Sequence, residues 1–175
     1  MKKPTGILEE MTLDDVRALQ ANVGLIPIGS TEPHGPALPY GTDTWQVATL
    51  AREATLRANG NGARVLCLPV QPVSLNNNFH AFPYACRMSV ATFMALLRDL
   101  IDLFQGEGVR RILVLNGHGG NPDVIRAVQR DLADHEGLFL GLVDFAKLVI
   151  LRNHDLWEDH ADHAGEEESS CMLHL

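Results

Sequence analysis

The chain has 175 residues, of which 46% are hydrophobic and 21% are charged, and its formal net charge is −8. This composition excludes wholesale disorder and is typical of one domain with a substantial core. The acidic balance argues against nucleic acid and anionic membrane surfaces as partners.

Nothing in the sequence indicates a membrane or secreted protein. The longest apolar tract, residues 138–151, is interrupted by Asp144 and Lys147 and is too short to span a bilayer. The start of the chain lacks the apolar region of a signal peptide, and the three cysteines are scattered without C-x-x-C spacing. We therefore expect a cytoplasmic protein with reduced thiols.

Strands and helices are predicted in alternation along the chain. Thr12, Ser89 and Asn121 are typical helix caps, and proline at 122 suits the first position of a helix. The predicted helices lie at 12–20, at 44–59, from 89 to the G-E-G stop at 106–108, at 121–136 and from 166 onward, and the predicted strands at 23–29, 64–70, 110–115 and 138–143.

These elements predict an α/β fold. The strand segments are nearly continuous apolar runs, which is typical of strands buried on both faces of a parallel sheet. We expect a three-layer αβα sandwich with a mainly parallel sheet, formed by residues 1–175 as a single domain. The last helix reaches Leu175 without a glycine, asparagine or proline stop signal. We therefore expect a native polypeptide that is longer, with this chain truncated at its C-terminus, or else an unusually short protein.

Two polar, glycine-rich segments follow predicted strands. The first is G-S-T-E-P-H-G-P-A-L-P-Y-G-T-D-T, after the strand at 23–29, and the second is N-G-H-G-G-N-P, after the strand at 110–115. Ligands of open α/β sheets bind beyond the carboxyl ends of the strands. The position and composition of these segments together predict the functional site.

The first segment carries three candidate metal ligands. Proline at 33 favours an extended chain, so Glu32 and His34 are expected to project to the same side, roughly 6–7 Å apart. This spacing is long for one ion but suits two ions about 3.5–4 Å apart. Asp43 follows His34 by nine residues and could bridge two cations through its two oxygens. On these residues alone, the alternative of a surface acid, a loop histidine and a helix N-cap remains open.

Two later segments add further candidates. In N-G-H-G-G-N, His118 is the one large side chain, and a metal ligand is favoured over a phosphate-binding loop because no Walker lysine is present. In H-A-D-H-A-G-E-E-E-S-S, at 160–170, His163 and one glutamate are candidate functional residues. The alternative for the acidic run is a solvated helix start, which the helix dipole favours.

Taken in order, these three motifs resemble the creatininase (creatinine amidohydrolase) family, from about Ile26 to the end of the chain. The resemblance implies an α/β sandwich with a binuclear metal centre that hydrolyses amide-type C–N bonds. It implies that the ligands of one metal are Glu32, Asp43 and His118, that those of the second are His34, the bridging Asp43 and Glu168, and that His163 transfers a proton.

The chain also departs from the family pattern. Members that open creatinine have a glutamate where this chain has Gly120, and the family often has a histidine where this chain has Ala37. The segment 82–89 replaces the usual F-P-G-T and is expected to line the substrate pocket. These departures leave the substrate open.

We therefore expect a metal-dependent hydrolase acting on carbon–nitrogen bonds other than peptide bonds, with a small-molecule amide substrate that is cyclic, a formamide or peptide-like. The expected cofactors are two divalent ions, Zn²⁺ first, with Mn²⁺ or Fe²⁺ as alternatives. The resemblance implies a homo-oligomer, a hexamer as in the family. Alternative functions are a deformylase, a peptidase acting on a modified peptide, and a non-catalytic metal-binding or assembly subunit.

Overall fold

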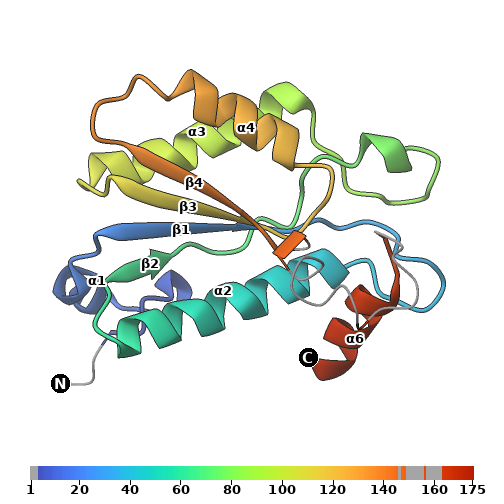
Figure 1. The fold of residues 1–175 in the computed structure, drawn as a ribbon, viewed down its shortest axis with the longest axis horizontal. Coiled ribbons are helices and arrows are strands. Elements are labelled where there is room, and N and C mark those ends of the chain that lie inside the picture. The colour runs from blue at the N-terminus through green and yellow to red at the C-terminus, as the bar shows by residue number, and fades with distance from the viewer. Residues whose placement is uncertain (1–3, 146, 149–155, 157–162) are drawn as a thin grey trace.

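A four-stranded parallel sheet forms the centre of the molecule (Figure 1). The computed structural model describes residues 4–145, 147–148, 156 and 163–175. The strands are β1 (Val23–Ile28), β2 (Val65–Cys67), β3 (Arg111–Asn116) and β4 (Phe139–Asp144), in the spatial order β2-β1-β3-β4. All three strand pairings are parallel, so the carboxyl ends of the strands meet at one edge.

Helices cover both faces of this sheet. α3 and α4 lie on one face and α2 on the other, with α6 beside the N-terminal end of α2 (Figure 1). The helices are α1 (Leu13–Leu19), α2 (Thr42–Gly60), α3 (Val90–Gly106), α4 (Pro122–Asp131) and α6 (Glu166–His174), with 3-10 turns η1 (Leu8–Glu10) and η2 (Asn77–Phe79). This arrangement confirms the predicted α/β fold class.

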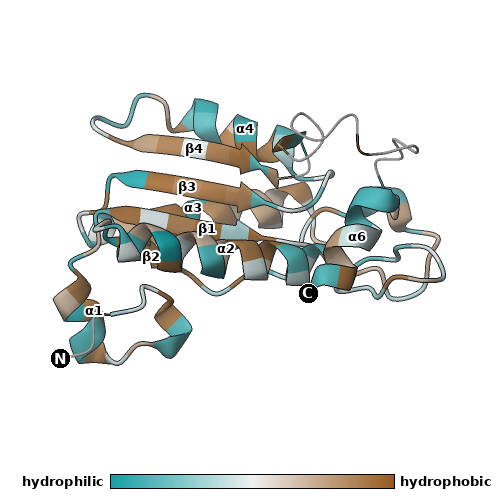
Figure 2. Cartoon of the chain, turned by 60° about the horizontal axis from the view of Figure 1, so that its bottom comes forward, coloured by the Kyte–Doolittle hydropathy of each residue, from teal (hydrophilic) through white to brown (hydrophobic). Residues whose placement is uncertain are grey.

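Apolar side chains pack on both faces of the sheet because successive residues of a strand point to opposite sides. Ile26 and Ile28 of β1 pack with α3 and α4, whereas Leu25 packs with Val47 of α2. Figure 2 shows hydrophobic strands between helices that carry hydrophilic residues on their outer sides. No helix in the described ranges is both long and apolar enough to cross a bilayer.

Most predicted boundaries agree with the structure to within two residues. Thr12 forms a capping box with Asp15, and the Ser89 hydroxyl accepts from the N–H of Thr92, as the sequence predicts. Two elements are shorter than predicted. β2 ends at Cys67, close to Pro69, which has no N–H to donate to a strand ladder. α4 ends at Asp131 and is followed by turns.

The prediction that the Asn121 side chain caps α4 is wrong. Asn121 occupies the N-cap position, but its side chain makes no cap hydrogen bond. Its Nδ2 donates to Asn116 Oδ1 at 3.0 Å, and its Oδ1 accepts from the N–H of Leu75 at 3.3 Å. The side chain therefore ties the loop after β3 to the end of that strand and to a neighbouring loop.

Candidate metal centre

The N-terminal end of α2 packs directly against the carboxyl ends of β1 and β3. A Cβ atom on Gly29 would lie 2.5 Å from Thr44 Cα, and one on Gly117 would lie 2.9 Å from Val47 Cβ. The Thr44 hydroxyl also donates to Ser30 O at 2.7 Å. Glycine at these two positions therefore allows the close approach that places Asp43, in the first turn of α2, between the two loops.

The structure brings all six predicted site residues into one cluster at this edge of the sheet. Four of them are buried, and two, from the C-terminal segment, are half-buried. Glu32 and His34 lie in the loop after β1, and His118 in the loop after β3. Three groups of residues place potential ligand atoms within 4.8 Å of one another, namely Glu32, Asp43 and His118; His34, Asp43 and Glu168; and Glu32, His34 and His163.

His118 directs one ring nitrogen at two carboxylates. Its Nε2 lies 2.9 Å from Leu75 O, and because a carbonyl oxygen only accepts, this nitrogen carries the hydrogen. Nδ1 then faces Glu32 Oε1 at 3.0 Å and Asp43 Oδ2 at 3.1 Å. Asp43 Oδ2 is buried and accepts no hydrogen bond among the described residues. Three electron-rich atoms thus converge on one point, which is the arrangement of a metal site.

His34 repeats this arrangement on the other side of Asp43. Its Nδ1 lies 3.1 Å from Glu32 O and therefore donates to that carbonyl. Its Nε2 faces Asp43 Oδ1 at 3.0 Å and Glu168 Oε1 at 3.6 Å. The two carboxylate oxygens of Asp43 therefore face different histidines, as a bridging ligand requires.

His163 joins the cluster from the C-terminal segment. Its Nε2 lies 2.8 Å from Pro33 O, and its Nδ1 lies 3.8 Å from Glu32 Oε1. The ring packs against those of His34 and Phe79, with centroid distances of 4.4 and 4.9 Å and interplanar angles of 38° and 36°. These contacts fix the ring plane and leave Nδ1 on the side of the carboxylates.

The carboxylates dominate the electrostatics of the cluster. Burial disfavours the charged form of His34, but hydrogen bonds to Asp43 and Glu168 and the charge of Asp43 outweigh it and raise the pKa to about 10. Burial likewise opposes the charged form of His118, but contacts with Asp43 and Glu32 raise its pKa to about 10. Burial also opposes ionisation of Asp43, but its contacts with His118 and His34 lower its pKa. In the absence of metal, His34 and His118 therefore stay protonated and balance the charge of the carboxylates.

A cavity of about 290 Å³ opens onto the cluster. Besides cluster residues, it is lined by Asn78, Phe79, Gly119 and Gly120. The expectation that residues 82–89 line the substrate pocket is not met in this cavity, since its wall comes from the preceding turn. Asn78 and Phe79 belong to no sequence motif, and their role is visible only from their place in the wall of this cavity.

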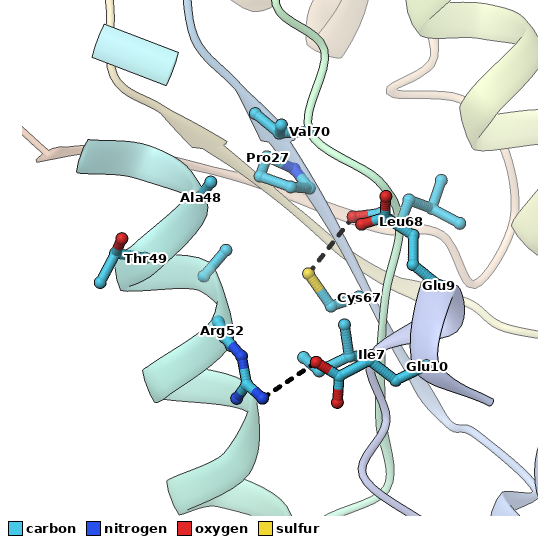
Figure 3. A pocket seen from close by; sticks show the side chains of 11 residues that line it. Ile7, Glu9, Glu10, Pro27, Ala48, Thr49, Arg52, Cys67, Leu68 and Val70 are labelled. Carbon is cyan, nitrogen blue, oxygen red and sulfur yellow. Dashed lines mark hydrogen bonds and ion pairs between the residues drawn. The ribbon is translucent and has the colours of Figure 1, made fainter. Parts of the chain in front are cut away.

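A separate cavity of about 380 Å³ lies between α2, η1 and β2. Figure 3 shows the side chains that line it. Cys67 lies in its wall, and Arg52 closes one side through a 2.9 Å ion pair with Glu10. Burial raises the pKa of the Cys67 thiol to about 11, so the thiolate is scarce near neutral pH. Cys67 is therefore poorly suited to act as a nucleophile.

Three relatives of this chain are named as a hydrolase, a peptidase and a deformylase. A 3-dehydro-scyllo-inosose hydrolase from Thermotoga maritima is 31% identical over 125 residues, covering 68% of this chain and 38% of that protein. The mycofactocin precursor peptide peptidase of Mycolicibacterium smegmatis is 30% identical over 152 residues, covering 86% and 57%. A 2-amino-5-formylamino-6-ribosylaminopyrimidin-4(3H)-one 5'-monophosphate deformylase from Methanobrevibacter ruminantium is 26% identical over 154 residues, covering 87% and 58%. The chain thus spans less than two thirds of the length of each relative.

Solved structures and a family model agree on the fold. A candidate creatinine amidohydrolase from Bacteroides fragilis matches with a TM-score of 0.80 at 29% identity, covering 99% of this chain and 68% of that one. A manganese creatininase has a TM-score of 0.79 at 21% identity, covering 98% and 73%, and a mutant creatininase of Zn-Zn type has 0.78 at 21%, covering 98% and 72%. The family model described as Creatininase: Creatinine amidohydrolase matches residues 9–175, and the chain belongs to this family.

Proposed function

We propose that this chain is a hydrolase that cleaves an amide-type C–N bond with two divalent cations bound at the cluster. One observation carries the proposal. In His34, His118 and His163, one ring nitrogen contacts a backbone carbonyl oxygen. The second ring nitrogen of each lies 3.0–3.8 Å from a carboxylate oxygen. A neutral imidazole nitrogen and a carboxylate repel each other at such distances, so this arrangement needs a cation between them, which is a proton at His34 and His118 in the metal-free site and a metal ion in the loaded one.

The candidate ligands divide into two sets that share Asp43. We assign Glu32, Asp43 and His118 to one cation and His34, Asp43 and Glu168 to the other. Mixed imidazole and carboxylate donors suit Zn²⁺, which we expect, with Mn²⁺ or Fe²⁺ as alternatives. Bound cations of this kind supply Lewis acidity, which polarises an amide carbonyl and lowers the pKa of water toward neutrality.

His163 is the group best placed to move a proton. It lines the cavity, and its Nε2–H is held by Pro33 O, so that Nδ1 is the nitrogen available for exchange. In the proposed reaction, Nδ1 takes a proton from the attacking water and passes it to the leaving nitrogen as the C–N bond breaks, which makes an amine a competent leaving group near neutral pH. Packing against His34 and Phe79 holds the plane of the ring and so lowers the entropic cost of orienting Nδ1 for this step.

The cavity indicates a small substrate or the end of a longer one. Its volume of about 290 Å³ is at the lower end of the range for small-molecule sites. The relatives named above include a deformylase and a peptide peptidase. We therefore propose a cyclic amide, a formamide or a peptide-like amide as the substrate class. Assembly into a homo-oligomer remains a prediction from the family resemblance.

Metal analysis followed by a substrate screen tests this function. The purified chain is loaded with Zn²⁺ or Mn²⁺, its metal content is measured, and a panel of cyclic amides, formamides and short peptides is assayed with Asp43→Ala as the control. We expect close to two metal equivalents and turnover that Asp43→Ala abolishes. A chain that binds two equivalents but turns over no amide would instead favour a non-catalytic metal-binding or assembly subunit. A chain that binds no metal would refute the proposed centre.

A further inference from the structure

Glu168 reaches the metal centre from a different part of the molecule than the other candidate ligands. Glu32, His34 and His118 lie on loops that follow sheet strands, and Asp43 lies on α2, which packs on the sheet. Glu168 lies on α6, which has no fully buried residue. Apolar packing therefore gives α6 a weak hold on the core, and polar contacts must place Glu168.

Two hydrogen bonds do so. The N–H of Ala164 donates to Glu168 Oε2, which leaves Oε1 directed at His34 Nε2 at 3.6 Å. Gln46 Nε2 donates to the backbone carbonyl of Glu168 at 3.0 Å and joins α2 to α6. The Ala164 bond is local to the C-terminal segment, whereas the Gln46 bond spans 122 positions of sequence and connects that segment to the core.

The burial of Gln46 and its position on α2 both suit this contact. It is 7% exposed, although glutamine is a residue that proteins normally leave at the surface. It follows Asp43 by three positions on α2, so the two side chains lie on the same side of that helix. One turn of α2 thus supplies both the shared ligand, Asp43, and the hydrogen bond from Gln46 that fixes the backbone of Glu168.

We infer that Gln46 is a positioning residue for one cation only, the one assigned to His34, Asp43 and Glu168; this inference rests on the proposed metal centre. The set of Glu32, Asp43 and His118 does not depend on α6. Its histidine is held by Leu75 O, and the N–H of Glu32 donates to Tyr40 O at 3.1 Å. The two ligand sets are therefore held in place by different contacts, and the set completed by Glu168 on α6 binds its cation more weakly.

Gln46→Met tests the inference, because methionine has nearly the same length and volume but cannot donate. Partners of metal ligands commonly contribute 10–100-fold in metal affinity. Titrating the metal-free full chain with Zn²⁺ should therefore show one binding step that is ~10–100-fold weaker in Gln46→Met and another that is unchanged. Gln129→Met is the matched control, since Gln129 Nε2 donates to Leu140 O at 2.8 Å on the far side of the sheet.

Hydrogen exchange supplies a readout that does not depend on turnover. With Zn²⁺ present, amides of residues 166–174 should exchange faster in Gln46→Met than in the wild type, while amides of β1 and β3 should not change. In the Glu168→Gln background, Gln46→Met should have no further effect on metal content, because the cation bound by His34, Asp43 and Glu168 is already lost.

Other outcomes overturn the inference. Two unchanged binding steps in Gln46→Met, equal weakening of both steps, or the same change in Gln129→Met would each do so. These results are distinct from failure of the proposed metal centre, in which the wild type itself would bind no metal, and from failure of the proposed catalysis, in which the wild type would bind two equivalents but turn over no amide.

Discussion

His34 Nε2 lies 3.0 Å from Asp43 Oδ1, while the other oxygen of the same carboxylate lies 3.1 Å from His118 Nδ1. Asp43 is thus the point at which the loops after β1 and β3 meet. It is 2% exposed, and both of its oxygens face imidazole nitrogens rather than the backbone N–H groups of a helix start. The interpretation of this residue as a plain helix cap is therefore wrong, since the N-cap position of α2 belongs to Gly41.

Replacing the shared carboxylate should affect both cations. We expect Asp43→Asn to lose both metal equivalents, because the neutral amide removes a charge that both ligand sets use. His34→Ala should lose about one equivalent, since His118 and Glu32 remain. Elemental analysis of the purified variants checks this difference. Loss of the same number of equivalents in both variants would contradict a bridging role for Asp43.

The sequence predicts the sheet and most of this cluster because both depend on local patterns. Continuous apolar runs specify buried parallel strands, and each candidate ligand lies in a short motif at the end of a strand or the start of a helix. Gln46, Asn78 and Phe79 could not be found in this way. Gln46 and Phe79 contact the C-terminal segment and Asn78 lines the cavity, and an amide or an aromatic ring in a helix or turn carries no distinctive spacing.

The error at Asn121 has a similar cause. An asparagine before a proline is a typical helix start, and the helix does begin there. The side chain nevertheless bonds to Asn116 Oδ1 and to the N–H of Leu75, partners that only the fold brings within reach. A local rule predicts the backbone correctly, whereas tertiary contacts decide where the side chain goes.

Gly120 should be intolerant of a side chain. A Cβ at this position would lie 2.5 Å from both His118 Nε2 and Leu75 O, between the two partners of the hydrogen bond that orients this histidine. We expect Gly120→Ala to weaken one metal equivalent by ~10-fold or more. Gly119→Ala is the control, because a Cβ there would meet nothing within 4 Å. Metal titration of the two variants checks the prediction, and equal effects would contradict it.

Creatinine should be a poor substrate. The resemblance places a carboxylate at position 120 in members that open creatinine, and this chain has no side chain there and no room for one while His118 keeps its contact. We expect negligible creatinine hydrolysis by the metal-loaded chain under conditions in which another amide of the panel is turned over. Robust creatinine turnover would contradict this prediction.

Among three consecutive glutamates, Glu168 alone should matter for metal binding. Successive helical positions point about 100° apart, and Glu168 is the one whose carboxylate faces His34. Glu167 Oε1 instead lies 3.8 Å from the thiol of Cys171 on its own helix. We expect Glu168→Gln to lose one metal equivalent and most activity, and Glu167→Gln to retain both equivalents. Similar small losses in both variants would mean that the acidic run is only a favourable helix start, which contributes ~0.3–1 kcal/mol per exposed acid.

Removal of the metals should give the protein a distinctive pH dependence. The pKa values of His34 and His118 rise from an ordinary value of 6.5 to about 10 in the metal-free fold. Because the folded chain then binds these protons more tightly than the unfolded chain does, the stabilisation is complete below about pH 6.5 and is lost as the pH rises toward 10. We expect the Tm of the EDTA-treated chain to fall across this interval. With Zn²⁺ bound, the cation occupies the place of the protons, and the fall should be smaller. His118→Gln should flatten the metal-free profile, whereas His135→Gln, at an exposed position outside the cluster, should not. A metal-free profile that is flat from pH 6.5 to 10 in the wild type would show that the carboxylates do not hold the histidines in their charged form.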